Sequence, residues 1–181
     1  MSSPGSDAAD EFMDEIVIPT VKEFFSELDN TRRAKLACIT VSSLADYFVY
    51  ERLGLCSSVV QAEKNEKQRT TIHLDEWSKQ CDSFGLVRDI GDATKHMKLI
   101  RKTANLTQAS DVKQDNASLT LPDSSTLVLA DEGGGYSPLI LPTEVWATDK
   151  GGKQYPVSDL VKKAVLFLQE RMGRTPAWPL P

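Results

Sequence analysis

The chain contains few of the residues from which disulfide frameworks and metal centres are built. Three cysteines and two histidines occur among its 181 residues. Three cysteines are too few, and odd in number, for the disulfide framework of a small secreted domain. The cysteines and histidines also show none of the short spacings that are typical of metal ligands. We therefore expect no disulfide, no metal and no cofactor.

A long apolar run is missing as well. The most apolar stretch, residues 34–50, is interrupted by Lys35 and Asp46 and is marginal in length for crossing about 30 Å of hydrocarbon. The first ten residues have neither a basic residue nor an apolar stretch, which argues against a secretory signal. We expect a cytoplasmic protein that does not enter a membrane.

Basic residues are in deficit. Lys and Arg number 21 against 26 Asp and Glu, a net charge of −5. This balance disfavours broad, phosphate-driven binding, so we expect no DNA binding. RNA stays open because Lys95, Lys98, Arg101 and Lys102 form one local basic cluster. Apolar residues at 40% and charged residues at 26% are otherwise typical of a globular domain with one core.

Helical spacing of apolar residues dominates the first hundred residues. It predicts four helices, at about residues 16–28, 31–52, 57–81 and 86–100. Pro19 fits either the first turn of the first helix or a kink in a longer one. Thr31 offers an N-cap for the second helix, and Gly54 stands where that helix should end. The polar run at residues 63–71 is expected to face solvent or to break the third helix.

Short apolar runs separated by turn residues follow a polar connector at residues 105–116. They predict strands at 118–121, 126–130, 139–141 and 145–148. Ser158 then caps a last helix, whose apolar face comprises Val161, Ala164, Val165, Leu168 and Met172. The fold class is therefore mainly α (α+β), a helical bundle with a small antiparallel β-hairpin or meander before the C-terminal helix.

The same patterns divide the chain into three parts. Residues 1–10 are small and polar and are expected to be disordered. Residues 11–172 form a single helical domain with the β insertion at about 117–156. Residues 173–181 contain three prolines and are expected to be an extended tail.

The densest polar motif is Arg88 to His96 on the fourth predicted helix. Arg88, Asp92 and His96 are spaced four residues apart, and Asp89 shares their side of the helix. A carboxylate beside a histidine can orient the imidazole for general acid–base catalysis. The same column is also what a solvated face with neutralising charges looks like. Spacing alone leaves both interpretations open.

The second histidine, His73, gives the column a further alternative. If the third and fourth helices form an antiparallel hairpin, His73 and His96 are similarly distant from the turn near Phe84 and could approach each other. A metal would then need Asp89, Asp92 or Asp46 as further ligands, and no ligand spacing supports that.

The remaining candidates favour structural roles. Cys38 and Cys81 lie on apolar stripes and are expected in the core, whereas Cys56 is the one plausible exposed thiol. The run Gly133-Gly134-Gly135 lacks the Lys-Ser/Thr that follows a phosphate-binding loop, so a hairpin tip is favoured.

Two stretches carry a resemblance. The segments around Pro19, Arg32-Arg33-Ala34 and Ala45-Asp46-Tyr47, with Arg88-Asp89-Ile90 and Lys95-His96, resemble a group of uncharacterised small bacterial helical proteins. Those proteins have an Asp-Tyr helix and a Lys-His helix, and the resemblance spans residues 15–100. The candidate binding residues are Asp46, Tyr47, Asp92 and Lys95.

More remotely, an arginine followed by a histidine on one helix of a bundle resembles HEPN-type domains, some of which are metal-independent RNases. The resemblance implies catalytic roles for Arg88, Asp89 and His96. In those domains four to six residues separate the arginine from the histidine, and here seven do.

Two functions from different classes follow. The first is a non-catalytic interaction or regulatory domain that acts through a protein partner or by self-association as a homodimer. The alternative is a HEPN-like RNase in which Arg88 steadies phosphate and His96 transfers a proton. Small-ligand binding between the bundle and the hairpins is a third hypothesis, for which the sequence offers no diagnostic residue.

Overall fold

The computed structural model describes residues 7–52, 63–96, 104–106, 108–115, 128–130, 136–138 and 144–178. Helices dominate these residues, and a small antiparallel sheet precedes the last helix, so the predicted mainly α fold class is confirmed. Among the described helices, none combines the length and the apolar character needed to cross a bilayer.

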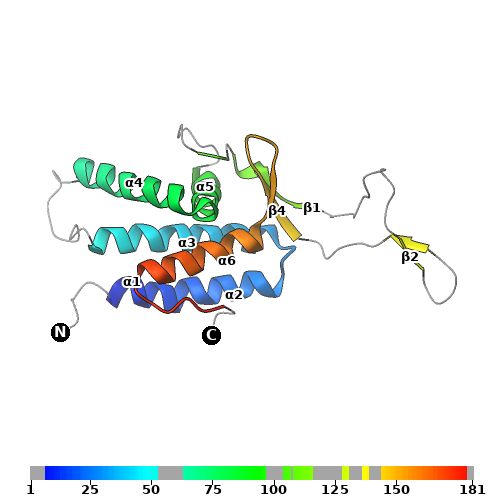
Figure 1. The fold of residues 1–181 in the computed structure, drawn as a ribbon, viewed down its shortest axis with the longest axis horizontal. Coiled ribbons are helices and arrows are strands. Elements are labelled where there is room, and N and C mark those ends of the chain that lie inside the picture. The colour runs from blue at the N-terminus through cyan, green and yellow to red at the C-terminus, as the bar shows by residue number, and fades with distance from the viewer. Residues whose placement is uncertain are drawn as a thin grey trace.

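The helices pack in layers around α5. In Figure 1, α2 (Ile18–Ser26), α3 (Thr31–Arg52) and α6 (Val157–Arg171) run across the view, and α4 (Glu63–Gln80) lies above α3. The remaining long helix, α5 (Asp82–His96), is seen nearly end-on and contacts α3, α4 and α6. Because α5 touches three other helices, most of its residues are buried.

The first helical segment is longer than predicted. Helix α1 (Asp7–Phe12), the π-helical turn η1 (Met13–Val17) and α2 follow one another without a break. Ala9 is buried, so the expectation of disorder is wrong for residues 7–10, while residues 1–6 lie outside the described residues. The wide turn ends two residues before Pro19, whose ring would clash with the carbonyl one α-helical turn earlier. Pro19 lies in the first turn of α2, as one of the two alternatives predicted, and α2 directly continues the π-helical turn η1.

Helix α3 has the bounds and the buried stripe that its sequence predicts. The stripe includes Ala34, Ala37, Cys38, Val41 and Leu44, all within 1% of complete burial. The N-cap is Asn30 and not Thr31, because the Asn30 side-chain oxygen accepts the Arg33 backbone N–H at 3.1 Å.

Helices α4 and α5 meet at a corner. Helix α4 continues through residues 63–71, so the predicted break is wrong, and α5 begins four residues before Leu86. Only Cys81 separates the two helices, and backbone hydrogen bonds from Cys81 to Trp77 and from Gly85 to Cys81 continue across it. Since α4 runs across the view of Figure 1 and α5 is seen end-on, the antiparallel hairpin assumed for His73 and His96 is wrong.

The three-stranded sheet has the order β1-β4-β5 and is antiparallel throughout. It comprises β1 (Val112–Asp115), β4 (Glu144–Thr148) and β5 (Gln154–Pro156). In β4, Val145 and Ala147 are buried in the core, which is the alternation that the sequence of this strand predicts. Strand β1 lies in the segment predicted as a polar connector. The sequence did not indicate it because Val112 is the one apolar residue of this edge strand and gives no periodic signal.

A second pair, β2 (Val128–Ala130) with β3 (Tyr136–Pro138), is antiparallel. The first matches the strand predicted at 126–130, whereas the strands predicted at 118–121 and 139–141 lie outside the described residues. The same holds for Gly133–Gly135, for Gly54 to Ser58 and for residues 97–100.

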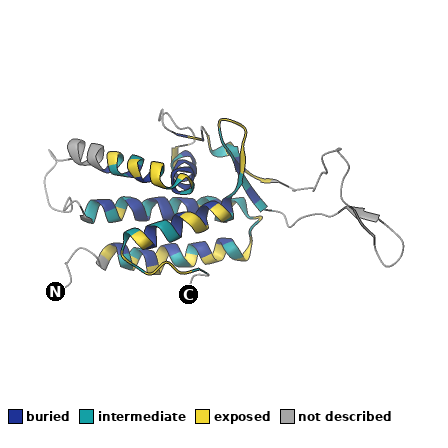
Figure 2. Cartoon of the chain, viewed as in Figure 1, coloured by how far each residue is buried: buried dark blue, intermediate teal, exposed yellow. Residues whose placement is uncertain are grey.

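The last helix begins one residue before the predicted cap. Pro156 occupies the N-cap of α6, and Ser158 instead donates its hydroxyl hydrogen to the Glu144 carboxylate on β4. Val161, Ala164, Val165 and Leu168 are buried as predicted, while Met172 is half-buried. Figure 2 shows that the buried faces of α3, α5 and α6 are turned toward one another, and they form one core.

Candidate functional site

The motif from Arg88 to His96 divides into a buried and an exposed part. Arg88 is 6% exposed and Asp89 3%, whereas Lys95 and His96 in the last turn of α5 are exposed. The four residue types therefore do not share one environment, although the helical spacing places several of them on one side. The predicted catalytic set of Arg88, Asp89 and His96 is not brought together in one cleft of the described structure.

Arg88 is held by an acid from the preceding helix. Its Nη1 lies 2.7 Å from Oδ1 of Asp75 on α4. A guanidinium has five N–H donors, and this is its one partner among the described residues. Sequence reasoning missed Asp75, which lies thirteen residues before Arg88, because only the corner at Cys81 brings the two together.

Asp89 has a structural contact. Its carboxylate accepts the backbone N–H of Asn105, which ties the segment after α5 back to the helix. Asp75, Arg88, Asp89 and Asn105 also line a surface hollow of about 220 Å³. A carboxylate that binds a main-chain N–H in this way positions the chain.

The histidines stay apart from this cluster. His96 has no polar partner within the described part of the chain, and His73 on α4 lies 3.9 Å from Glu76. Lys95 contacts the Ser43 hydroxyl at 3.4 Å. No group of three or more His, Cys, Asp or Glu side chains in the described ranges is placed to hold a metal ion. The other members of the basic cluster, Lys98, Arg101 and Lys102, lie outside the described residues.

A polar hollow of about 240 Å³ lies between α3, α4 and α5. It brings together two predicted binding residues, Asp46 and Asp92, which are far apart in sequence. Besides them its walls include Ser42, Tyr50, Thr70 and Arg88. Ser42, Asp46 and Tyr50 follow one another at intervals of four on α3, a periodic polar stripe that could have indicated the site.

The backbones around the polar hollow approach closely. A Cβ on Gly91 of α5 would lie 3.1 Å from the Cys38 carbonyl oxygen and 3.2 Å from Cβ of Ser42 on α3. A larger residue would push α5 away from α3 and widen the hollow. Gly91 therefore fixes the distance between two of its walls.

An apolar hollow of about 190 Å³ lies elsewhere, between α1, η1 and α3. Tyr47 lines it and stacks on Phe12, with the ring centroids 4.8 Å apart. Tyr47 is 50% exposed and the neighbouring Ile16 42%. Glu11 and Glu15 stand in the same lining, and no described residue forms an ion pair with either. Tyr47 and Asp46 are therefore adjacent in sequence but belong to different hollows.

Of the two cysteines in the described part of the chain, Cys38 is unsuited to act as a nucleophile. Cys38 is in the core, and burial raises the pKa of its thiol. Cys81 is half-buried at the corner between α4 and α5, and Cys56 lies outside the described residues. A thiol with a raised pKa is a poor nucleophile because little thiolate forms at neutral pH.

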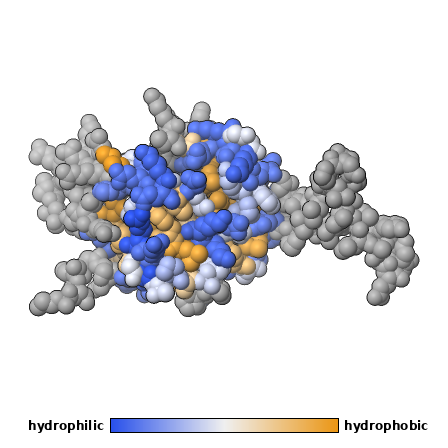
Figure 3. All heavy atoms as spheres, in the orientation of Figure 1, coloured by the Kyte–Doolittle hydropathy of each residue, from blue (hydrophilic) through white to orange (hydrophobic). Residues whose placement is uncertain are grey.

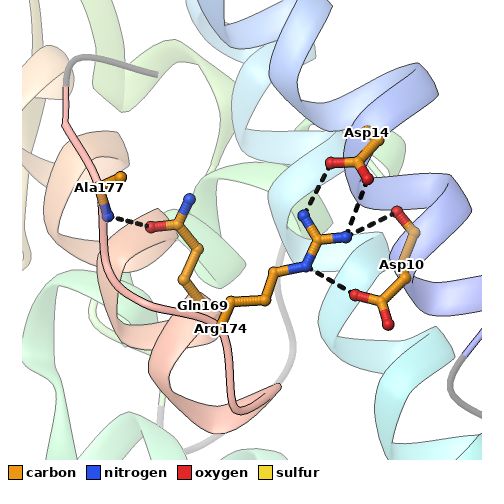
Figure 4. A network of polar contacts seen from close by, with 5 residues as sticks. All are labelled: Asp10, Asp14, Gln169, Arg174 and Ala177. Carbon is orange, nitrogen blue, oxygen red and sulfur yellow. Dashed lines mark hydrogen bonds and ion pairs between the residues drawn. The ribbon is translucent and has the colours of Figure 1, made fainter. Parts of the chain in front are cut away.

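The C-terminal segment is fastened across the first helix (Figure 4). Arg174 reaches Asp10 with Nε at 2.6 Å and Asp14 with Nη1 at 2.7 Å. These contacts hold the pKa of the Asp14 carboxyl below its usual value, chiefly through the hydrogen bond from Arg174. Gln169 accepts the Ala177 backbone N–H, and Trp178 packs edge-on against Phe25. The expected extended tail therefore packs on the bundle over residues 174–178.

Comparison of the chain with protein-family models, with curated proteins and with solved structures finds no match. The geometry of the two hollows and of the Arg88 cluster therefore carries the functional argument.

Proposed function

We propose that this chain is a non-catalytic interaction domain whose apolar hollow binds a segment of another protein. The observation that supports this is the gathering of Phe12, Ile16 and Tyr47 around one hollow, with two of these side chains more than 40% exposed. Exposed apolar residues are ordinary when they are scattered, whereas a cluster beside a hollow is typical of an interaction site. The face drawn in Figure 3 carries hydrophilic residues with several hydrophobic patches between them.

The charges at the apolar hollow indicate which side chains a partner segment would carry. Asp10 and Asp14 on the same helical segment are neutralised by Arg174, but Glu11 and Glu15 are exposed and face the hollow without a cation from the described chain. The complementary partner segment carries an apolar side chain for the hollow and a Lys or Arg for these carboxylates.

A second copy of the chain fits this surface less well. In a two-fold symmetric dimer the same patch meets itself, which would bring Glu11 and Glu15 toward the same carboxylates of the partner. Repulsion between like charges disfavours that arrangement. The homodimer expected from the sequence is therefore the alternative that the experiment below would detect.

Catalysis has less support from the site. Arg88 lies in the interior with Asp75, and His96 lies on the surface of the last turn of α5. An RNase of the expected type would need both side chains at one phosphate.

The test uses two labelled helical peptides, one with Leu and Lys on one face and one with Glu in place of each Lys. Fluorescence anisotropy should show at least about tenfold tighter binding of the basic peptide, weakening with added salt. Ile16→Ser should abolish this binding. Ile72→Ser is the matched control, because Ile72 is 51% exposed on α4 and lies outside the hollow.

Three outcomes would contradict the proposal. The first is equal binding of both peptides, or no binding of either. The second is a dimer in sedimentation that Ile16→Ser dissociates, which would assign the surface to self-association. The third is cleavage of mixed RNA by the protein that is lost in both Arg88→Ala and His96→Ala, which would establish the RNase alternative.

A further inference from the structure

The last described residues lie across helices from the other end of the chain. After α6 the chain reverses at Gly173, whose φ of 76° is in the left-handed region that glycine adopts without strain. Residues 174–178 then run back past the N-terminal helices without regular secondary structure (Figure 1). In this segment Arg174 and Trp178 are half-buried, and the three residues between them are exposed. The segment is therefore held by two side chains that are four positions apart.

Arg174 is the first of these two anchors. Its Nη1 and Nη2 lie 2.7 Å and 3.0 Å from the two carboxylate oxygens of Asp14, and its Nε lies 2.6 Å from Oδ1 of Asp10. Nη2 also donates to the backbone carbonyl of Asp10 at 3.2 Å, so every nitrogen of the guanidinium has a partner (Figure 4). This arrangement requires a planar fork of donors, which the single ammonium group of a lysine cannot reproduce.

Trp178 is the second anchor. Its ring packs edge-on against Phe25 of α2, with the centroids 4.7 Å apart. Nζ of Lys162 on α6 lies 5.6 Å from the centroid of the Trp178 ring. An aromatic neighbour together with a nearby cation favours a large aromatic side chain at this position. Tryptophan and arginine are also the residue types that most often dominate the binding energy of an interface.

A third contact involves only the main chain of the segment. Gln169 on α6 is 4% exposed, and its Oε1 accepts the Ala177 backbone N–H at 3.0 Å. Such a bond does not depend on which side chain precedes the tryptophan. Recognition of main-chain groups combined with two side-chain anchors is typical of sites that bind extended peptides.

We define the docking surface as the residues that receive the segment, namely Asp10, Asp14, Phe25, Lys162 and Gln169. Without the segment, this surface would expose an aromatic ring and leave two acids and a buried amide oxygen without the partners that they have in this structure. Terminal segments with few contacts detach at a low cost in free energy. A segment of another chain that carries the same groups can therefore take the place of the chain's own.

We propose that the docking surface is a peptide-binding site for a segment of another protein that carries an arginine and a tryptophan four positions apart. The chain's own C-terminal residues fill this site until such a segment displaces them. A second copy of the chain gains nothing by exchange, because its own segment is already bound at a high effective concentration. The docking surface shares no residue with the lining of the apolar hollow, so neither proposal depends on the other.

Fluorescence anisotropy with a labelled peptide of residues 172–181 tests this inference. The full-length double variant Arg174→Ala/Trp178→Ala keeps the docking surface and removes both anchors of the attached segment. It should bind the peptide at least about tenfold more tightly than the unmodified protein, in which the attached segment competes. Peptides with Lys in place of the arginine, or with Ala in place of the tryptophan, should bind the double variant at least about tenfold more weakly.

Substitutions in the protein separate specific binding from general attraction of charge. In the double variant, Asp14→Asn should weaken peptide binding at least about tenfold, whereas the matched control Asp29→Asn, on an exposed loop, should leave it unchanged. Adding Ile16→Ser should also leave it unchanged, so this test and that of the apolar hollow fail independently. Circular dichroism checks the folding of the double variant. The milder variant Trp178→Ala, which keeps Arg174, should bind the peptide with intermediate affinity.

Several results would overturn the inference. One is equal binding of the peptide by the double variant and the unmodified protein, or binding by neither. Another is binding that persists when the peptide lacks its tryptophan or when the protein carries Asp14→Asn, which would indicate attraction of charge alone. A dimer of the unmodified protein in sedimentation that Trp178→Ala dissociates would assign the docking surface to the segment of a second copy.

Discussion

Arg88 and Arg174 both hold carboxylates, the first in the interior and the second near the surface. Among the described residues, Arg88 bonds to Asp75 alone, with its side chain 8% exposed. Arg174 makes bonds to Asp10 and Asp14 through all three of its nitrogens, with its side chain 26% exposed and that of Asp14 58% exposed. The number of contacts is larger at the surface, but the energetic consequence of removing the arginine depends on solvent. Water replaces a lost surface partner and reaches the interior poorly.

The largest effect is therefore expected at the arginine with fewer contacts. Arg88→Ala should lower the free energy of unfolding by about 3 kcal/mol, because it removes a buried guanidinium bonded to Asp75 and opens a space beside the polar hollow. Urea denaturation measures this. Arg32→Ala is the control, since Arg32 is exposed on α3, and it should change stability by less than about 0.5 kcal/mol. Equal effects of the two substitutions would show that the buried position of Arg88 contributes nothing to the free energy of unfolding.

Arg174→Ala should have an intermediate effect. We expect a loss of about 1 kcal/mol, because exposed ion pairs contribute little singly but this guanidinium joins two acids on another element. The C-terminal segment should also become more sensitive to proteolysis, while the peptide bonds of α3 should not. A stability loss as large as that of Arg88→Ala would reverse the comparison.

The contribution of the Arg174 ion pairs to stability should decrease in acid. The hydrogen bond from Arg174 holds the pKa of Asp14 below the ordinary value for an aspartate. The contribution of Asp14 to stability is therefore fully present above that ordinary value and disappears as the pH falls through the lower, folded-state pKa. The stability difference between the protein and Arg174→Ala should therefore be constant from pH 7 to about 5 and shrink below about pH 4. Denaturation curves over this range measure it. A difference that grows with acid would contradict this assignment.

The smallest effect is expected at the exposed end of α5. His96→Ala should change the free energy of unfolding by less than about 0.5 kcal/mol, since His96 is exposed and has no polar partner in the described ranges. The comparison with Arg88→Ala then tests two residues of one helix that differ in depth. A loss above about 1 kcal/mol in urea denaturation would place His96 in a structural contact with residues outside those described.

Periodic segments were predictable because they depend on local spacing. The stripe from Ala34 to Leu44 defines one face of α3, and Val161 to Leu168 define one face of α6, whatever they pack against. Strand β1 was missed because its pairing with β4 is decided more than thirty residues later in the chain, where Val112 meets Ala147. The start of α1 was missed because burial of Ala9 depends on α3 and not on its polar neighbours.

The candidate site was predictable only in part. Asp46, Tyr47 and Asp92 were singled out from short motifs, and each does line a hollow, but the sequence could not separate Asp46 from Tyr47. Adjacent residues on a helix point about 100° apart, so one faces α4 and α5 while the other faces α1. Arg88 and His96 share a helix side, but Arg88 lies in the buried middle of α5 and His96 at its exposed C-terminal end.

By itself, the sequence determined where most of the helices form and which of their faces are apolar, because a helix repeats every 3.6 residues and its side chains record that repeat. The tertiary structure alone decided which polar groups meet and how far each lies from water. Asp75 reaches Arg88 through the corner at Cys81, and Arg174 reaches Asp10 from the other end of the chain. Contacts of that kind depend on the packing of whole helices, and no local pattern encodes them.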